Sequence, residues 1–126
     1  MKALVKRAKV LLYTPEQENQ QIYKKFFEDA GLAVRELRPQ DFGTCTADLA
    51  IGKTDNTETS FSPDQAFAVF CFCTSSKLDR ILRALRAPGV PPLPLKASMT
   101  PTNATWTLQK LYEEVSSEHQ LMHEQA

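Results

Sequence analysis

The run AFAVFCFC at residues 66–73 constrains the fold more than any other stretch of the sequence. All of its side chains are apolar, with no alternation between apolar and polar positions. A half-exposed strand alternates, whereas a strand covered on both faces does not. The run therefore predicts a strand at the centre of a sheet that has packed layers on both sides.

Patterns on either side of this run predict that strands and helices alternate along the chain. The expected elements, in chain order, are a strand at residues 9–14, a helix that ends at Gly31, a strand at 33–37, a helical turn at 46–51, the central strand at 66–73, a helix that starts between Thr74 and Ser76, a strand within 93–99 and a last helix from about Thr107. Pro91, Pro92 and Pro94 lack the amide donors that a central strand needs. The strand within 93–99 therefore belongs at an edge of the sheet.

Two sheet arrangements fit this order of βαβ, loop, βαβ and final helix. The favoured one is α+β, a ferredoxin-like βαβ-βαβ sandwich with an added C-terminal helix, because the two halves are similar in size. The alternative is a small doubly wound α/β sheet, but no glycine-rich phosphate turn follows Thr14 or Cys73 to favour a nucleotide-binding fold. A ferredoxin-like sheet leaves one face without helices. The last helix or a second copy of the chain is expected to cover that face.

Length and charge limit the classes of protein to which the chain can belong. Its 126 residues suffice for one hydrophobic core, so residues 1–126 are expected to form a single domain. Lys and Arg together balance Asp and Glu, at 15 each, which argues against a general binder of nucleic acid or of anionic membranes. The polar stretch at residues 52–65 has few groups to bury and is expected to be a mobile loop.

The cysteines and the N-terminus predict a cytoplasmic protein. Three cysteines, an odd number, fit a reducing compartment better than a disulfide framework. The basic N-terminal run is too short for a signal peptide or a membrane span. Cys71 and Cys73 are spaced to face one side of the central strand as buried small hydrophobes. His119 and His123 share a helical face, but no third ligand completes a zinc site, so neither a metal nor a cofactor is expected.

The corner between the edge strand and the last helix is the best candidate for a binding site. The first backbone amides of the helix need partners there, and those amides with the Lys96 ammonium would suit a small anion. The candidate ligand-binding residues are Lys96, Thr100, Thr102, Asn103 and Trp106. The simpler interpretation is that Asn103 or Thr107 caps the helix. Trp106 then packs the corner onto the core, and Lys96 protects the edge of the sheet.

The same stretch carries the pattern of a known family. The matching residues are Pro94, Leu95, Lys96, Ala97, Thr100, Thr102, Asn103, Trp106, Thr107, Leu111, Glu114, Glu118 and His119. In these residues the chain resembles the bacterial family catalogued as domain of unknown function 3783. The resemblance covers the last part of the chain and implies a small bacterial protein of the cytoplasm. It carries over no activity.

Charged faces on two predicted helices have two interpretations, a solvated surface, which is favoured, and the interface of a possible homodimer. Basic residues recur along the helix after the central strand at Lys77, Arg80, Arg83 and Arg86, and acidic residues stand on the last helix at Glu113, Glu114 and Glu118. Such faces are usually only solvated. Where they meet between two copies of a chain, they set the register of the dimer more than its affinity.

Motifs for catalysis are scarce in the sequence. It has no nucleophile elbow, no P-loop and no pair of carboxylates in a recognisable cleft. The expected function is therefore a non-catalytic module that binds a small anionic ligand or a protein partner at the corner from Lys96 to Trp106. The alternative is a small enzyme in which Lys96 acts and Thr100, Thr102 and Asn103 hold the substrate.

Overall fold

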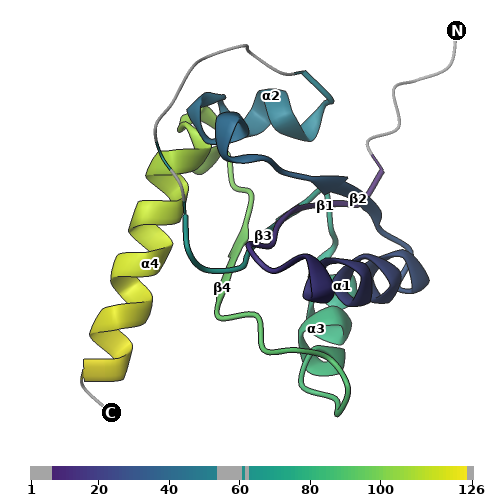
Figure 1. Ribbon diagram of the computed structural model, residues 1–126. Helices are drawn as coiled ribbons and strands as arrows, with labels where there is room; N and C mark the ends of the chain where they lie inside the picture. Colours follow the sequence, from purple (N-terminus) through teal and green to yellow (C-terminus); the bar gives the residue numbers. More distant parts are fainter. Residues whose placement is uncertain (1–6, 54–60, 62, 125–126) are drawn as a thin grey trace, which may run out of the picture.

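The predicted strands and helices all occur, each within a few residues of its expected limits. The computed structural model describes residues 7–53, 61 and 63–124, with the side chains of 122–124 outside that description. The elements are β1 (Lys9–Tyr13), α1 (Gln17–Asp29), β2 (Ala33–Glu36), the 3-10 helix η1 (Pro39–Gly43), α2 (Thr46–Ala50), β3 (Phe67–Cys71), α3 (Ser75–Ala84), β4 (Leu95–Ser98), the 3-10 helix η2 (Asn103–Thr105) and α4 (Leu108–Glu124) (Figure 1).

The four strands form one mixed sheet in the order β2-β1-β3-β4. β1 pairs with β2 in parallel, and β3 pairs with β4 in parallel. β1 and β3 run antiparallel at the centre, with Leu11 opposite Val69. Every residue of β3 is buried, so the predicted central strand is confirmed. β4 lies at an edge, as its prolines require.

The α+β class holds, but the ferredoxin-like strand order does not. In a ferredoxin-like sheet each pair of parallel strands is split by a strand from the other half. Here each βαβ unit keeps its two strands adjacent, and the two units meet through β1 and β3. The segment between β2 and β3, residues 37–66, is too long for the hairpin that would make those strands neighbours. It instead carries η1 and α2 to a face of the sheet.

Packed layers cover both faces of the sheet (Figure 1). The first core lies under α1 and α3 and includes Val10, Leu12, Tyr23, Phe27, Phe70 and Ile81. The second core lies under η1, α2 and α4 and includes Leu11, Phe42, Leu49, Phe67, Leu108 and Tyr112. Because α1 and α3 share one face, the doubly wound alternative is also wrong. The last helix helps to cover the second face, which is one of the two covers expected from the sequence.

Phe42 stands at the centre of the second core. Its side chain is fully buried, and its ring contacts the rings of Tyr13, Phe61, Phe67 and Tyr112. Burying an aromatic side chain of this size stabilises a fold by roughly 1.5–3 kcal/mol. Phe61 belongs to the stretch at 52–65 that we expected to be mobile, and most of that stretch, residues 54–60 and 62, lies outside the described residues.

A residue with left-handed backbone ends the central strand. Phe72 has a φ of 61°, a conformation that is unfavourable for a bulky side chain. It breaks the alternation, so Cys71 joins the second core and Cys73 packs against the first. The prediction that both cysteines face one side of the strand is therefore wrong. Helix α3 then starts with Thr74, whose Oγ1 accepts the Lys77 N–H at 3.2 Å.

Candidate functional site

The polar groups of the corner after β4 bond mainly to one another. The Asn103 side chain accepts the Thr100 N–H at 2.8 Å and donates to the Ser98 carbonyl at 3.0 Å. The Asn103 N–H donates to Thr100 Oγ1 at 3.1 Å. The Thr105 hydroxyl donates to the Thr102 carbonyl at 2.9 Å. These bonds stabilise the turn from β4 into η2, a structural role of the kind that the simpler interpretation describes.

Lys96 and Trp106 lie at different places around β4. Trp106 is partly buried against the second core, and the Lys110 ammonium lies 4.6 Å from the centre of its ring. Lys96 donates instead to the Leu93 carbonyl, before the start of β4. Burial lowers the pKa of Lys96, and the nearby Arg86 guanidinium adds to that shift. The structure therefore does not bring Lys96 to the corner turn, and ligand binding at the corner stays a prediction.

The charged faces of α3 and α4 lie on opposite sides of the sheet (Figure 1). Arg80 and Arg83 are exposed on α3, and Glu113, Glu114 and Glu118 are exposed on α4. A contact between α3 of one copy and α4 of another would join two different surfaces and leave one of each free. Contacts of that kind build rings or open chains more readily than closed dimers. The homodimer stays a prediction, and this placement gives it no added support.

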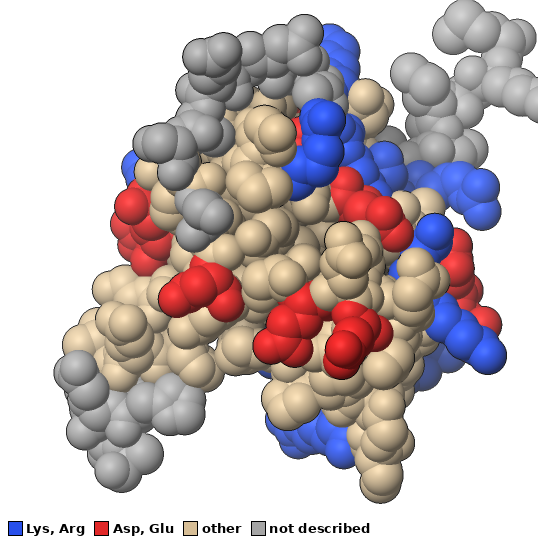
Figure 2. Space-filling view, viewed as in Figure 1, with Lys and Arg blue, Asp and Glu red and all other residues tan. Residues whose placement is uncertain are grey.

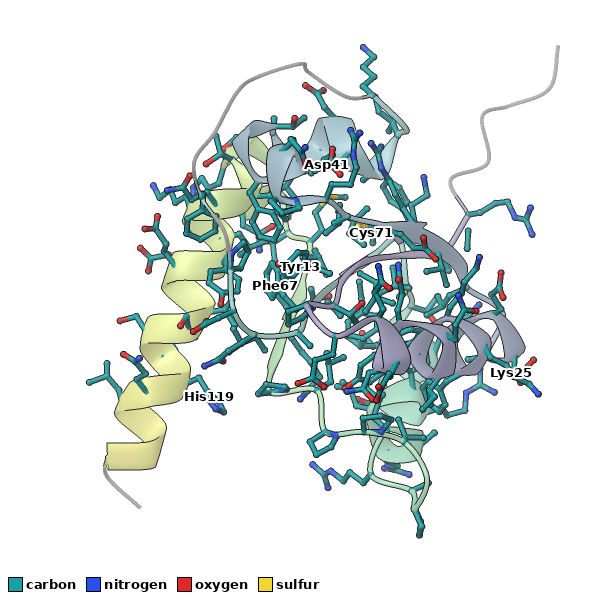
Figure 3. The ribbon with its side chains drawn as sticks, in the orientation of Figure 1. Tyr13, Lys25, Asp41, Phe67, Cys71 and His119 are labelled. Carbon is teal, nitrogen blue, oxygen red and sulfur yellow. The ribbon has the colours of Figure 1, made fainter. Side chains whose placement is uncertain are left out.

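The histidine pair proposed from the sequence can be followed only in part. His119 lies on α4, well away from Cys71 (Figure 3), and the side chain of His123 is outside the described residues. Within residues 7–53, 61 and 63–124, no group of three or more His, Cys, Asp or Glu side chains is arranged to hold a metal ion. In the same part of the chain, none of the helices combines the length and the apolar content that crossing a bilayer requires.

A hollow of about 180 Å³ opens at the start of α1. This hollow, the α1 pocket, is lined by Thr14, Glu16, Asn19, Tyr23, Asp64 and Gln65, together with Ala66 and three prolines. Three segments meet there: the residues after β1, those before β3 and the proline run that leads into β4. The antiparallel register explains the meeting, because it places Tyr13 beside Phe67 (Figure 3) and so carries Thr14 and Gln65 to one end of the sheet.

Two buried oxygen atoms at the α1 pocket have no hydrogen-bond partner. They are Thr14 Oγ1 and Gln65 Oε1, and no partner for either exists among the described residues. Buried polar groups are nearly always paired, because leaving one unpaired costs roughly 1–3 kcal/mol. A third such oxygen, Thr44 Oγ1, is buried between η1 and α2. Two of the residues that line the α1 pocket thus carry a buried oxygen without a hydrogen-bond partner.

The remaining polar groups of the α1 pocket include both acceptors and donors, and the Asn19 amide donates to Glu16 Oε2 at 2.9 Å. The side chains of Glu16 and Asp64 are exposed at its rim. The Tyr23 hydroxyl lies 2.6 Å from the Pro92 carbonyl and 3.0 Å from that of Pro91, and it ties α1 to the proline run. Burial raises the pKa of Tyr23, and the negative charge of Glu16 adds to that shift. No Lys, Arg or His is among the described residues that line the pocket.

Residues 66–122 match the model of a family described as Domain of unknown function (DUF3783). The chain contains a DUF3783 domain. The resemblance that we drew from residues 94–119 is therefore confirmed, and the match extends it to β3 and α3. Searches among curated proteins and among solved structures found no match to the chain.

The α1 pocket lies where the DUF3783 domain meets the rest of the chain. Ala66, Pro92 and Pro94 belong to the matched residues, Gln65 directly precedes them, and Thr14 comes from the first βαβ unit. Sequence patterns did not single out either residue with an unpaired oxygen. Thr14 reads as the end of a strand and Gln65 as the end of a polar loop. The available signal was weak, since a polar residue next to an apolar strand usually only marks the strand's end.

Proposed function

We propose that this chain is a non-catalytic module that binds a small polar molecule in the α1 pocket. The observation that supports the proposal is the pair of buried, unpaired oxygens, Thr14 Oγ1 and Gln65 Oε1, in side chains that line one hollow. A molecule that donates hydrogen bonds to both oxygens, after a small rotation of each side chain, would remove a penalty that the unliganded protein carries. The hollow lies beyond the carboxyl end of β1 and the amino ends of β3 and β4, and small ligands usually bind in concave hollows where a few polar groups converge.

Binding is a better account of the α1 pocket than catalysis. A hydroxyl nucleophile needs an adjacent base, and Thr14 Oγ1 has no hydrogen-bond partner among the described residues. The Tyr23 hydroxyl is already directed at proline carbonyls. Lys96, the residue on which the enzyme alternative depends, lies outside the pocket beside Leu82 and Ser98. The residues of the α1 pocket therefore have binding roles in our proposal.

The test is a screen of small fragments by amide NMR spectroscopy of the isotope-labelled full chain. The pocket volume of about 180 Å³ corresponds to about six water molecules at ~30 Å³ each, so fragments of that size are suitable. We expect at least one chemical class to shift the amide signals of residues 16–19 and 64–66 in a saturable way. Thr44→Val is the matched control, because it removes an unpaired oxygen outside the pocket. A well-dispersed spectrum in which no class of fragment moves these signals would refute the proposal.

A further inference from the structure

We infer that the ligand of the α1 pocket is a small primary amine bound as its ammonium ion. The inference rests on the proposed function and names the chemical class of the ligand. It comes from the hydrogen-bonding inventory of the pocket, in which the Asn19 amide is a donor but already donates to Glu16 Oε2 at 2.9 Å. The Gln65 oxygen and the carboxylates of Glu16 and Asp64 only accept hydrogen bonds, and the Thr14 oxygen can accept as well. An ammonium group offers three donors and no acceptor, so it complements such a set.

The charges around the α1 pocket favour a cation. Figure 2 shows acidic side chains close together on the face where α1 begins in Figure 1. Glu16 is the residue before the first turn of α1, and Glu18 lies in that turn. These carboxylates oppose the positive end of the helix dipole, which would otherwise favour an anion. With no cationic side chain among the described lining residues, an anionic ligand would meet carboxylates and find no counter-charge.

The pKa values of two neighbouring tyrosines are raised in part by the same carboxylates. Burial raises the pKa of Tyr13, and the charge of Asp64 raises it further. The pKa of Tyr23 is raised in the same way, mainly by burial and then by the charge of Glu16. A carboxylate that disfavours a phenolate also favours an ammonium ion nearby, because both effects arise from one negative charge.

The apolar lining and the volume of the α1 pocket limit the size and chemistry of the carbon chain of the amine. Pro15, Ala66, Pro92 and Pro94 supply apolar surface beside the polar groups. Burial of the ligand's methylene groups against such surface favours binding. A volume of about 180 Å³ has room for a short aliphatic chain and excludes a nucleotide or a long peptide.

The experiment compares three probes of similar size and different charge: propylammonium, 1-propanol and propionate. Each is titrated into the full chain while the amide signals of residues 16–19 and 64–66 are followed. We expect propylammonium to bind in the millimolar range and at least ten times more tightly than either other probe. We expect Gln65→Met and Thr14→Val each to weaken propylammonium binding about tenfold, since hydrogen bonds to a charged group are among the stronger ones. Thr44→Val should bind it as the unmodified chain does, and the spectra show whether each variant is folded.

The outcomes separate this inference from the proposed function. If propanol or propionate binds at these residues as tightly as propylammonium, the ammonium assignment is wrong while the pocket still binds ligands. If propylammonium binds and neither Gln65→Met nor Thr14→Val weakens it, the unpaired oxygens are not its partners and the inference also fails. If neither these three probes nor any fragment of the wider screen moves the signals, both proposals fall together.

Discussion

Two buried threonines that differ in one hydrogen bond provide a direct test of the hydrogen-bond argument. Thr44 and Thr46 are both fully buried. The Thr46 hydroxyl donates to the Trp106 carbonyl at 3.0 Å, whereas Thr44 Oγ1 has no partner among the described residues. Valine has nearly the same shape as threonine, so Thr44→Val removes the unpaired hydroxyl and leaves the packing in place. We expect the free energy of unfolding to rise by about 1 kcal/mol, the lower end of the penalty for a buried unpaired group.

Thr46→Val should have the opposite effect. It removes the hydroxyl bond, but the Trp106 carbonyl keeps its bond from the Thr46 N–H at 2.9 Å. No acceptor is left without a partner, so we expect a loss of only about 1 kcal/mol. The two variants should therefore differ by about 2 kcal/mol in the free energy of unfolding, although the same chemical group is deleted in both.

Urea unfolding followed by circular dichroism measures this difference. The slope of the free energy against urea concentration should be the same for both variants, because the surface exposed on unfolding hardly changes. A change of about 1 kcal/mol then moves each midpoint by roughly 0.5 M, upward for Thr44→Val and downward for Thr46→Val. A downward shift of equal size for both would show that Thr44 Oγ1 has a partner in solution, and the reasoning that distinguishes paired from unpaired oxygens would fail.

Two further predictions concern Cys71 and Lys96. Burial and the neighbouring Cys73 raise the pKa of Cys71 from 9.0 to about 12. Above a pH of about 9 the unfolded chain loses this proton while the folded protein keeps it, so the free energy of unfolding should fall with pH by up to about 1.4 kcal/mol per unit. Urea midpoints at increasing alkaline pH should show a steeper decline for the unmodified chain than for Cys71→Ala, and equal slopes would contradict the prediction. Lys96→Ala should change the stability by less than about 1 kcal/mol, because its amine makes one bond at an exposed edge. The corner site has a separate test that does not depend on Lys96: inorganic phosphate should shift amide signals of residues 100–106 in the unmodified chain and in Lys96→Ala alike, and no shift in either would remove the corner as an anion site.

The order of elements was predictable because each one carries a local pattern. The run at 66–73 is typical of a strand covered on both faces, and the prolines before β4 favour a position at the edge of the sheet. The choice of neighbouring strand carries no such local signal. An apolar run packs as well beside a parallel neighbour as beside an antiparallel one, so the ferredoxin-like order and the observed order predict the same central and edge strands. The strand order depends on the path of residues 37–66, whose helices cover the second face.

The positions of single side chains were less predictable than the elements. Cys73 was expected beside Cys71 because residues two apart share a face of a regular strand. The left-handed backbone of Phe72 ends that regularity, and no glycine marks the position in the sequence. The corner residues show the opposite case. Their capacity for local hydrogen bonds was visible in the sequence, but only the geometry shows that Asn103 bonds to Thr100 and Ser98.

The three unpaired oxygens allow a comparison between a packing defect and the proposed binding site. Thr44 Oγ1 lies in a fully buried residue of the second core, so the simplest account is that the hydroxyl is a small defect of packing. Thr14 and Gln65 are partly exposed side chains at a hollow, and an equal penalty there can be removed by a ligand. Thr44→Val and Thr14→Val should therefore both stabilise the unliganded protein. Only Thr14→Val should lose the added stability that a bound amine provides. A ligand stabilises the folded state only to the extent that it binds that state, and Thr14→Val removes one of its hydrogen-bond partners.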